Sequence, residues 1–234
     1  MGRAINEVKN RSILSIQMKL HLGCGQRYLK GYINIDFPAS EHTVQDKSIA
    51  DIQADITQLS YPASTIDEVR LHHVFEHFTR PVACGLLVAW RSWLKIGGTL
   101  RIEVPDSHRM SLIISNPLTL QRSKTVALRH MFGSHEARWA IHCEGWTIDR
   151  LTKILKTLGF AIIKCKKNSW KGTYNFEIIG KKNDTRFSNI DIENNVKGFL
   201  SDYLVDLSQS ELKLLDVWIK AYKNQLHNCL ARGE

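Results

Sequence analysis

The sequence predicts a doubly wound α/β fold built on a mostly parallel sheet of seven strands. Along most of the 234 residues, short apolar runs alternate with segments of helical periodicity, which is typical of a parallel sheet with helices on both faces. The link between the last two apolar runs, residues 166–172, is polar and too short for a helical crossover. It therefore predicts an antiparallel strand at one edge of the sheet.

The expected strands end in residues suited to a binding site. Ligands of such sheets bind at the carboxyl ends of the strands, and each of the first five runs is followed by a glycine or a polar residue. These strands are 19–22, 32–36, 49–55, 67–73 and 99–104, and the residues at their ends are Gly23, Asp36, Asp55, His72 and Asp106. The last two strands are expected at 161–165 and 175–180.

Four segments have the apolar spacing of helices, at 81–94, 118–131, 148–158 and 212–226. Pro81 suits a first turn, Gly97 and Gly98 suit a helix end, and Thr147 suits a cap. The last segment carries an apolar stripe that packs either on the core or on a second subunit, which would make a homodimer. We divide the chain into a lead-in (1–17), a sheet domain (18–182) and a helical C-terminal extension (183–234).

The composition, 43% hydrophobic and 24% charged, is that of an ordinary soluble globular protein. No apolar stretch approaches the roughly 18 residues of a membrane span, and Met1–Asn10 lacks an apolar signal core. The five cysteines are widely spaced and never form Cys-x-x-Cys. This is typical of reduced thiols in the cytoplasm and argues against disulfides and against a zinc–cysteine site.

The net charge of +9 comes almost entirely from the middle of the chain. Residues 61–180 contain 17 basic and 9 acidic side chains and seven of the ten histidines. This excess indicates an anionic partner: a phosphorylated or nucleotide-linked substrate, a nucleic acid or a membrane surface. A basic face that is merely solvated is the other interpretation.

The first strand leads into a glycine turn, Leu20-His21-Leu22-Gly23-Cys24-Gly25. Two glycines allow the backbone to turn tightly and to approach a ligand closely. Asp36, which closes the second strand, is placed to accept both hydroxyls of a ribose, as in dinucleotide-binding units. The stretch therefore indicates a nucleotide-like cofactor.

An ordered set of motifs extends this pattern over about two thirds of the chain, from residue 19 to residue 180. The motifs are His21-Leu22-Gly23-Cys24-Gly25, Ile35-Asp36, Asp55-Ile56, Tyr61-Pro62, Phe75-Glu76-His77, Leu94-Lys95-Ile96-Gly97-Gly98 and Val104-Pro105-Asp106. This set resembles the class I S-adenosyl-L-methionine-dependent methyltransferases, in the branch whose first motif reads Leu-His-Leu-Gly-Cys-Gly. The resemblance implies a Rossmann-like methyltransferase fold and S-adenosyl-L-methionine as the cofactor.

The resemblance also implies a role for each matching position. The turn would carry the methionine end of the cofactor, Asp36 its ribose and Asp55 with Ile56 its adenine, while His72 and His73 would lie near the carboxylate and the methyl group. The implied cofactor-binding residues are His21, Leu22, Gly23, Cys24, Gly25, Asp36, Asp55, Ile56, His72 and His73. Three positions depart from the family pattern: His21 replaces a common acid, which leaves the ammonium contact open, Arg27 replaces a third glycine, and Ile96 replaces a common proline with little effect.

Methyl transfer to a hydroxyl requires removal of a proton, for which histidine is suited. His142 and His135 lie in an irregular segment, 132–146, where insertions in the family form a substrate lid. They are the leading candidates for the proton acceptor, the alternative being that they pack in the loop.

Two further positions carry open alternatives. His77, beside Glu76, either acts in catalysis or ties the strand end to a neighbouring loop, and Asp106 either orients a substrate hydroxyl or caps the next helix. His73 and His77 with His135 and His142 could form a metal site only if the segment is helical. We therefore predict no metal.

The expected function is O-methylation of a small-molecule or glycan-linked substrate. Relatives with this first motif are similar to enzymes of bacterial surface-polysaccharide pathways. A nucleic-acid methyltransferase is the first alternative. Residues 71–75 lack the Asn/Asp-Pro-Pro-Tyr/Phe motif of base-amino enzymes, which argues against base methylation and leaves ribose or RNA targets open. A non-catalytic binding module is the second alternative, and the replacement at His21 is its only hint.

Overall fold

The computed structural model describes residues 17–41, 43 and 47–230. The expected lead-in at 1–17, apart from its last residue, lies outside the described residues, as does the stretch Met1–Asn10. Within the described part of the chain, no helix combines the length and apolar character that crossing a bilayer requires.

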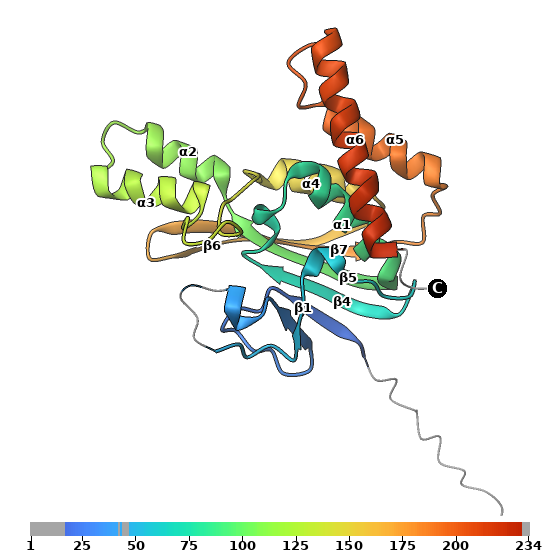
Figure 1. The fold of residues 1–234 in the computed structure, drawn as a ribbon. Helices are drawn as coiled ribbons and strands as arrows, with labels where there is room; N and C mark the ends of the chain where they lie inside the picture. The colour runs from blue at the N-terminus through green and yellow to red at the C-terminus, as the bar shows by residue number, and fades with distance from the viewer. Residues whose placement is uncertain (1–16, 42, 44–46, 231–234) are drawn as a thin grey trace, which may run out of the picture.

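Seven strands form one sheet in the order β3-β2-β1-β4-β5-β7-β6 (Figure 1). Strands β1 to β5 pair in parallel, whereas β7 runs antiparallel to β5 and to the edge strand β6. The fold class is therefore the predicted one, with its topological switch point between β1 and β4. The strands are β1 Lys19–Leu22, β2 Ile33–Asp36, β3 Ile52–Gln53, β4 Ile66–His72, β5 Leu94–Pro105, β6 Phe160–Trp170 and β7 Thr173–Lys182.

The α-helices of the described residues form two groups beside the sheet (Figure 1). The α-helices are α1 Arg80–Trp93, α2 Ser107–Ser115, α3 Gln121–Phe132, α4 Ile148–Thr157, α5 Asn189–Ser201 and α6 Gln209–Leu230, and the 3-10 helices are η1 Ala39–Glu41, η2 Ile56–Gln58 and η3 Phe75–His77. Buried residues of α1, α4, α5 and α6 share one core with the sheet. Figure 1 shows α2 and α3 as a pair apart from these helices, near β6.

The two faces of the sheet differ in character because side chains alternate along each strand. One face presents buried apolar residues such as Leu20, Val69 and Ile102 to the helical core. The residues between them are polar: His21, Arg70 and Arg101 lie opposite one another on β1, β4 and β5. This polar face and the adjoining carboxyl ends of the strands form the setting of the candidate site.

The C-terminal extension packs on the helical side of the sheet. At the contact of α1 with α6, a Cβ added to Gly85 would lie 2.9 Å from the Cβ of Gln225. The guanidinium of Arg80 stacks 3.8 Å from the ring centre of Tyr203, which adds a cation–π contact to the apolar packing. Leu215, Tyr222 and Cys229 of α6 belong to the same buried core as α1, whereas Val217 of the predicted stripe is exposed.

Several element boundaries differ from the sequence prediction. Strand β3 has two residues instead of seven, and α2 and α5 were not predicted. Strand β5 begins directly after α1, so Gly97 and Gly98 lie inside a strand instead of ending the helix. The hairpin strands are longer than predicted, because the turn consists only of Lys171 and Gly172, both with positive φ.

The glycine contact between α1 and α6 gives a matched test of packing. We expect Gly85→Ala to lower the free energy of unfolding by about 1–3 kcal/mol, because the new methyl group overpacks the contact with Gln225. A Cβ at Gly198 in α5 would have no atom within 4 Å. Gly198→Ala should therefore raise the free energy of unfolding by about 0.5–1 kcal/mol. Urea denaturation of both variants checks this, and equal shifts would contradict the packing account.

Candidate functional site

Two adjoining cavities lie at the carboxyl ends of the parallel strands. The smaller has a volume of about 700 Å³ and the larger about 930 Å³, both within the usual range for small-molecule sites. Both are lined by Arg27, His72, His73, His77, Glu136 and Trp139. These six residues mark the junction at which ligands in the two cavities would meet.

The glycine turn forms one wall of the smaller cavity and is fixed to β2. Gly23 has a φ of +68°, and a Cβ there would lie 2.2 Å from the Val74 side chain, so only glycine fits. The Gly23 N–H donates to the Ile35 carbonyl at 2.8 Å. The Gly25 N–H donates to Oδ2 of Asp36 at 2.6 Å. The Asp36 carboxylate thus lies beside the turn and on the cavity lining.

A second wall is built by the segment that follows β3. Oδ1 of Asp55 accepts hydrogen bonds from the backbone N–H and the hydroxyl of Thr57, both at 2.8 Å, and so caps η2. The Thr57 carbonyl in turn accepts from Nε2 of Gln225 at 2.8 Å. The far end of the chain therefore supports this wall through α6.

The structure brings together most of the residues predicted to bind the cofactor. Eight of them line the smaller cavity: Gly23, Cys24, Gly25, Asp36, Asp55, Ile56, His72 and His73. His21 and Leu22 do not line it, because both lie inside the sheet and are fully buried. Nδ1 of His21 lies 3.0 Å from Oδ1 of Asn34 on the neighbouring strand, and burial lowers the pKa of its imidazole.

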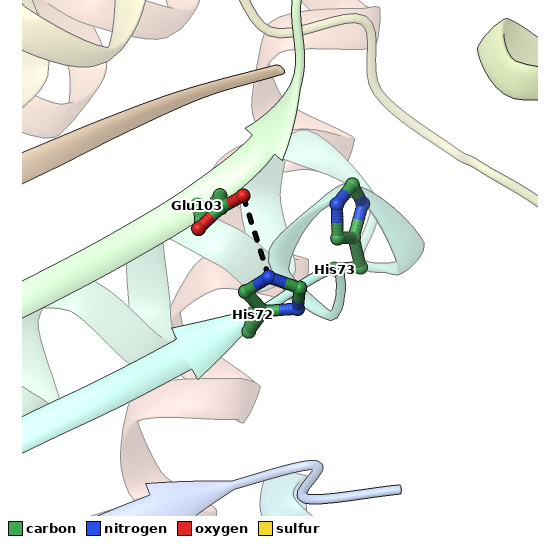
Figure 2. A group of neighbouring side chains, drawn as sticks. All are labelled: His72, His73 and Glu103. Atoms are coloured by element: carbon green, nitrogen blue, oxygen red, sulfur yellow. Dashed lines mark ion pairs between the residues drawn. The ribbon is translucent and has the colours of Figure 1, made fainter. Parts of the chain in front are cut away.

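Figure 2 shows His72 at the end of β4 facing Glu103 on β5, with His73 beside them. Nε2 of His72 lies 3.3 Å from Oε1 of Glu103, which also accepts from Nδ2 of Asn168 at 2.7 Å. Burial raises the pKa of the Glu103 carboxyl, but the bonds from His72 and Asn168 outweigh it and lower the pKa to about 2. Glu103 is therefore a carboxylate at neutral pH.

A second histidine–glutamate group surrounds Glu76, which is 1% exposed. Oε1 of Glu76 lies 3.2 Å from Nδ1 of His73 and 3.9 Å from Nε2 of His142. Burial raises the pKa of Glu76, but the hydrogen bond from His73 and the charges of His73, His77 and His142 outweigh it and lower the pKa. Burial also lowers the pKa of His142, which favours its neutral imidazole.

The tautomer of His77 follows from its contact with the loop. Nδ1 of His77 lies 3.2 Å from the carbonyl oxygen of Ile141. A carbonyl only accepts, so Nδ1 carries the proton and Nε2 of the neutral ring is the acceptor.

The backbone carbonyl of Glu76 accepts from the N–H groups of Cys143 and Glu144 at 2.8 and 3.2 Å. These contacts hold the loop that carries His142 against η3.

The four predicted catalytic residues divide into two pairs. His77 and His142 line the larger cavity, and His77 also lines the smaller. His135 and Asp106 line neither. The His135 ring lies 2.9 Å from the Phe132 carbonyl, and Oδ1 of Asp106 accepts from the Arg109 N–H and caps α2.

The irregular segment 132–146 contacts residues near β2 that the sequence did not indicate as its neighbours. Nε1 of Trp139 donates to the carbonyl of Glu41 at 2.6 Å, and its ring centre lies 6.5 Å from that of Phe37. The segment, which follows α3, thus reaches the residues that follow β2, beside the smaller cavity. The composition of 132–146 indicated a lid, but no local signal identified Trp139, Phe37 or Glu136 as lining residues.

The larger cavity extends over the polar face of β4, β5, β7 and β6. Lys164 and Lys166 are alternate residues of β6 and share one face with Asn168. Nε2 of His130, on α3, lies 2.7 Å from Oδ1 of Asn175. The basic residues of the lining are Arg27, Arg70, Arg101, Arg129, Lys164 and Lys166. This lining accounts for part of the positive charge in the middle of the chain.

Comparison with known proteins identifies the fold. No protein-family model and no curated protein matches the chain. A solved complex between the Haloferax volcanii Trm112 methyltransferase activator and a protein described as a methyltransferase matches with a TM-score of 0.50 at 13% identity, over 74% of this chain and 84% of that one. At this identity the match shows the fold, which is the Rossmann-like fold of class I methyltransferases.

Two other solved structures have TM-scores of 0.48. One is a SAM-dependent methyltransferase from Archaeoglobus fulgidus, 18% identical over 72% of this chain and 87% of that one. The other is the Burkholderia thailandensis 1,6-didemethyltoxoflavin-N1-methyltransferase with bound 1,6-didemethyltoxoflavin and S-adenosylhomocysteine, 11% identical over 71% of each chain.

The lowered pKa of Glu103 predicts a pH-dependent contribution to stability. Because the folded pKa is about 2, the carboxylate stabilises the fold above the ordinary glutamate range, and this contribution is lost as the pH falls toward 2. We expect Glu103→Gln to cost on the order of 1–2 kcal/mol at pH 7, allowing for solvent screening of the partly exposed pair. The cost should shrink at pH 3. Urea titrations at both pH values measure it, and equal costs would contradict the assignment.

Proposed function

We propose that the chain is an S-adenosylmethionine-dependent methyltransferase that binds its cofactor in the smaller cavity and a methyl acceptor in the larger one. The observation that carries this proposal is the junction: two cavities of ligand size meet at the switch point of a methyltransferase-type sheet, and six residues line both. Such a junction is what direct transfer between two bound molecules requires.

The residues of the smaller cavity fit the cofactor. Gly23 and Gly25 leave room beside the turn, and the carboxylate of Asp36 would accept the ribose hydroxyls. Asp55 and Ile56 would border the adenine, the acid accepting from its amino group. Besides Asp36 and Asp55, Glu136 is the remaining acid among the described residues that line the smaller cavity. We assign to Glu136 the contact with the ammonium group of the cofactor, which the buried His21 cannot make.

When bound, S-adenosylmethionine supplies an electrophilic methyl group on a sulfonium. The protein holds the acceptor hydroxyl at the junction and removes its proton. His77 and His142 line the acceptor cavity, and imidazole nitrogens are suited to accept a proton there. We therefore assign the activation of the acceptor hydroxyl to these two residues and give His135 and Asp106 no part in it.

The lining of the larger cavity favours an anionic acceptor. Six basic and four acidic side chains line it. Glu177 pairs with Arg70 and Arg101, while Arg129 of α3 and two lysines of β6 add further positive charge. A small-molecule or glycan-linked substrate that carries phosphate or carboxylate fits this lining. An RNA acceptor would use the same charges. RNA binding whose affinity falls with rising salt would favour that candidate instead.

Cofactor binding is tested at Asp36. We expect Asp36→Ala to weaken the binding of S-adenosylmethionine about 10–100-fold, because hydrogen bonds to a charged group contribute about 1.5–3 kcal/mol. Asp106→Ala is the matched control, since Asp106 lines neither cavity. Isothermal titration calorimetry measures both variants. A wild-type protein that does not bind the cofactor at high micromolar concentration would leave only the non-catalytic binding module.

The role of the irregular segment is tested at two tryptophans. Trp139 lines both cavities, whereas Trp170 lines only the larger. We expect Trp139→Ala to weaken cofactor binding about tenfold, because it removes the contact with Glu41 and opens the smaller cavity. Trp170→Ala should leave cofactor affinity unchanged. The same titration checks this, and an equal effect of both substitutions would rule out a specific role for Trp139.

A further inference from the structure

We propose that Glu76, His77 and His142 form a binding site for a divalent transition-metal cation at the junction of the two cavities. Metal binding stands on the geometry of these residues alone, whereas its catalytic role rests on the proposed methyl transfer. One ligand atom from each of the three residues can be chosen so that all three lie within 4.8 Å of one another. Two imidazoles and one carboxylate are an established donor set for such cations.

The carboxylate of Glu76 gives the strongest indication. It is almost completely buried, and its Oε2 has no hydrogen-bond partner among the described residues. Oε1 is held by His73 at 3.2 Å, so one oxygen is oriented while the other is available. A buried carboxylate oxygen without a partner is unfavourable, and a cation would compensate for it.

The two imidazoles are held in the manner of metal ligands. Nδ1 of His77 donates to the Ile141 carbonyl, which leaves Nε2 with its lone pair, and ligating histidines commonly make this backbone contact. His142 is carried by a loop whose backbone donates to the Glu76 carbonyl through Cys143 and Glu144. Small side-chain rotations would bring the three ligand atoms to the roughly 3.4 Å separation of a tetrahedral site.

The group drawn in Figure 2 is the competing candidate, because His72, His73 and Glu103 also offer ligand atoms within 4.8 Å of one another. Its carboxylate, however, already accepts from Asn168 at 2.7 Å and lies 3.3 Å from His72. This group is satisfied by its own hydrogen bonds. Glu76, in contrast, keeps one buried oxygen without a partner.

The donor set selects the kind of cation. Mg²⁺ and Ca²⁺ prefer oxygen ligands, whereas imidazole nitrogens favour Zn²⁺, Mn²⁺ and related ions. Three protein ligands leave a coordination position open toward the larger cavity, which Glu76 and His142 line. An acceptor hydroxyl bound there loses its proton more readily, because the cation stabilises the oxyanion. The two histidines would then activate the hydroxyl through the cation, and the released proton would pass to solvent.

The test is a titration of the EDTA-treated, full-length protein with Zn²⁺ by calorimetry, followed by Co²⁺ absorption spectroscopy. We expect one strong Zn²⁺ site per chain. His77→Ala and His142→Ala should each weaken it at least tenfold and reduce the Co²⁺ ligand-field bands. His72→Ala and His135→Ala are matched controls that should leave Zn²⁺ affinity unchanged. Cys143→Ser should also bind normally, which tests the nearby thiol as an alternative ligand.

The outcomes separate this inference from the proposed function. Three results would overturn the metal site: no Zn²⁺ binding by the wild type, wild-type Zn²⁺ affinity in the His77→Ala and His142→Ala variants, or loss of Zn²⁺ binding only in His72→Ala. Because Glu76 is buried and its substitution risks unfolding the protein, the two histidine variants decide the question, after their circular dichroism spectra are compared with wild type. Binding of S-adenosylmethionine without Zn²⁺ binding would refute only the metal site. Zn²⁺ binding without cofactor binding would refute only the proposed function.

Discussion

The alternation of side chains across the parallel strands is the constraint on which the rest of the structure depends. Leu20, Val69 and Ile102 face the helical core, and the residues that follow two of them, Arg70 and Glu103, face the other side. A shift of one strand by a single residue would bury the charges and expose the core residues. The fixed register therefore places Arg70, Arg101 and Glu103 on the face over which the larger cavity extends.

Much of the smaller cavity was predictable because its determinants are local in sequence. Gly23 requires a positive φ directly after a strand, and Asp36 and Asp55 end the next two predicted strands. The position of the His21 side chain could not be predicted from its neighbours in the sequence. Its pattern suggested a cofactor contact, but the side chain lies inside the sheet against Asn34.

The histidine–glutamate groups and the reach of the irregular segment were not predictable, because each depends on contacts between distant parts of the chain. Trp139 meets Glu41, 98 positions away, and the Glu76 carbonyl meets the N–H of Cys143. Helices α2 and α5 were missed for a different reason. Their apolar faces are short, and α5 begins at a capping box of Ser188 and Asp191, a signal outside the apolar pattern.

The hydrogen bond from Gln225 to the Thr57 carbonyl connects the last helix to a wall of the smaller cavity. Docking of α6 on α1 and ordering of that wall are therefore coupled equilibria. To the extent that docked α6 improves the binding of a molecule at this wall, the bound molecule strengthens the docking of α6 by the same coupling free energy. Resistance of the C-terminal helix to local unfolding thus becomes a remote measure of how fully the cavity is occupied.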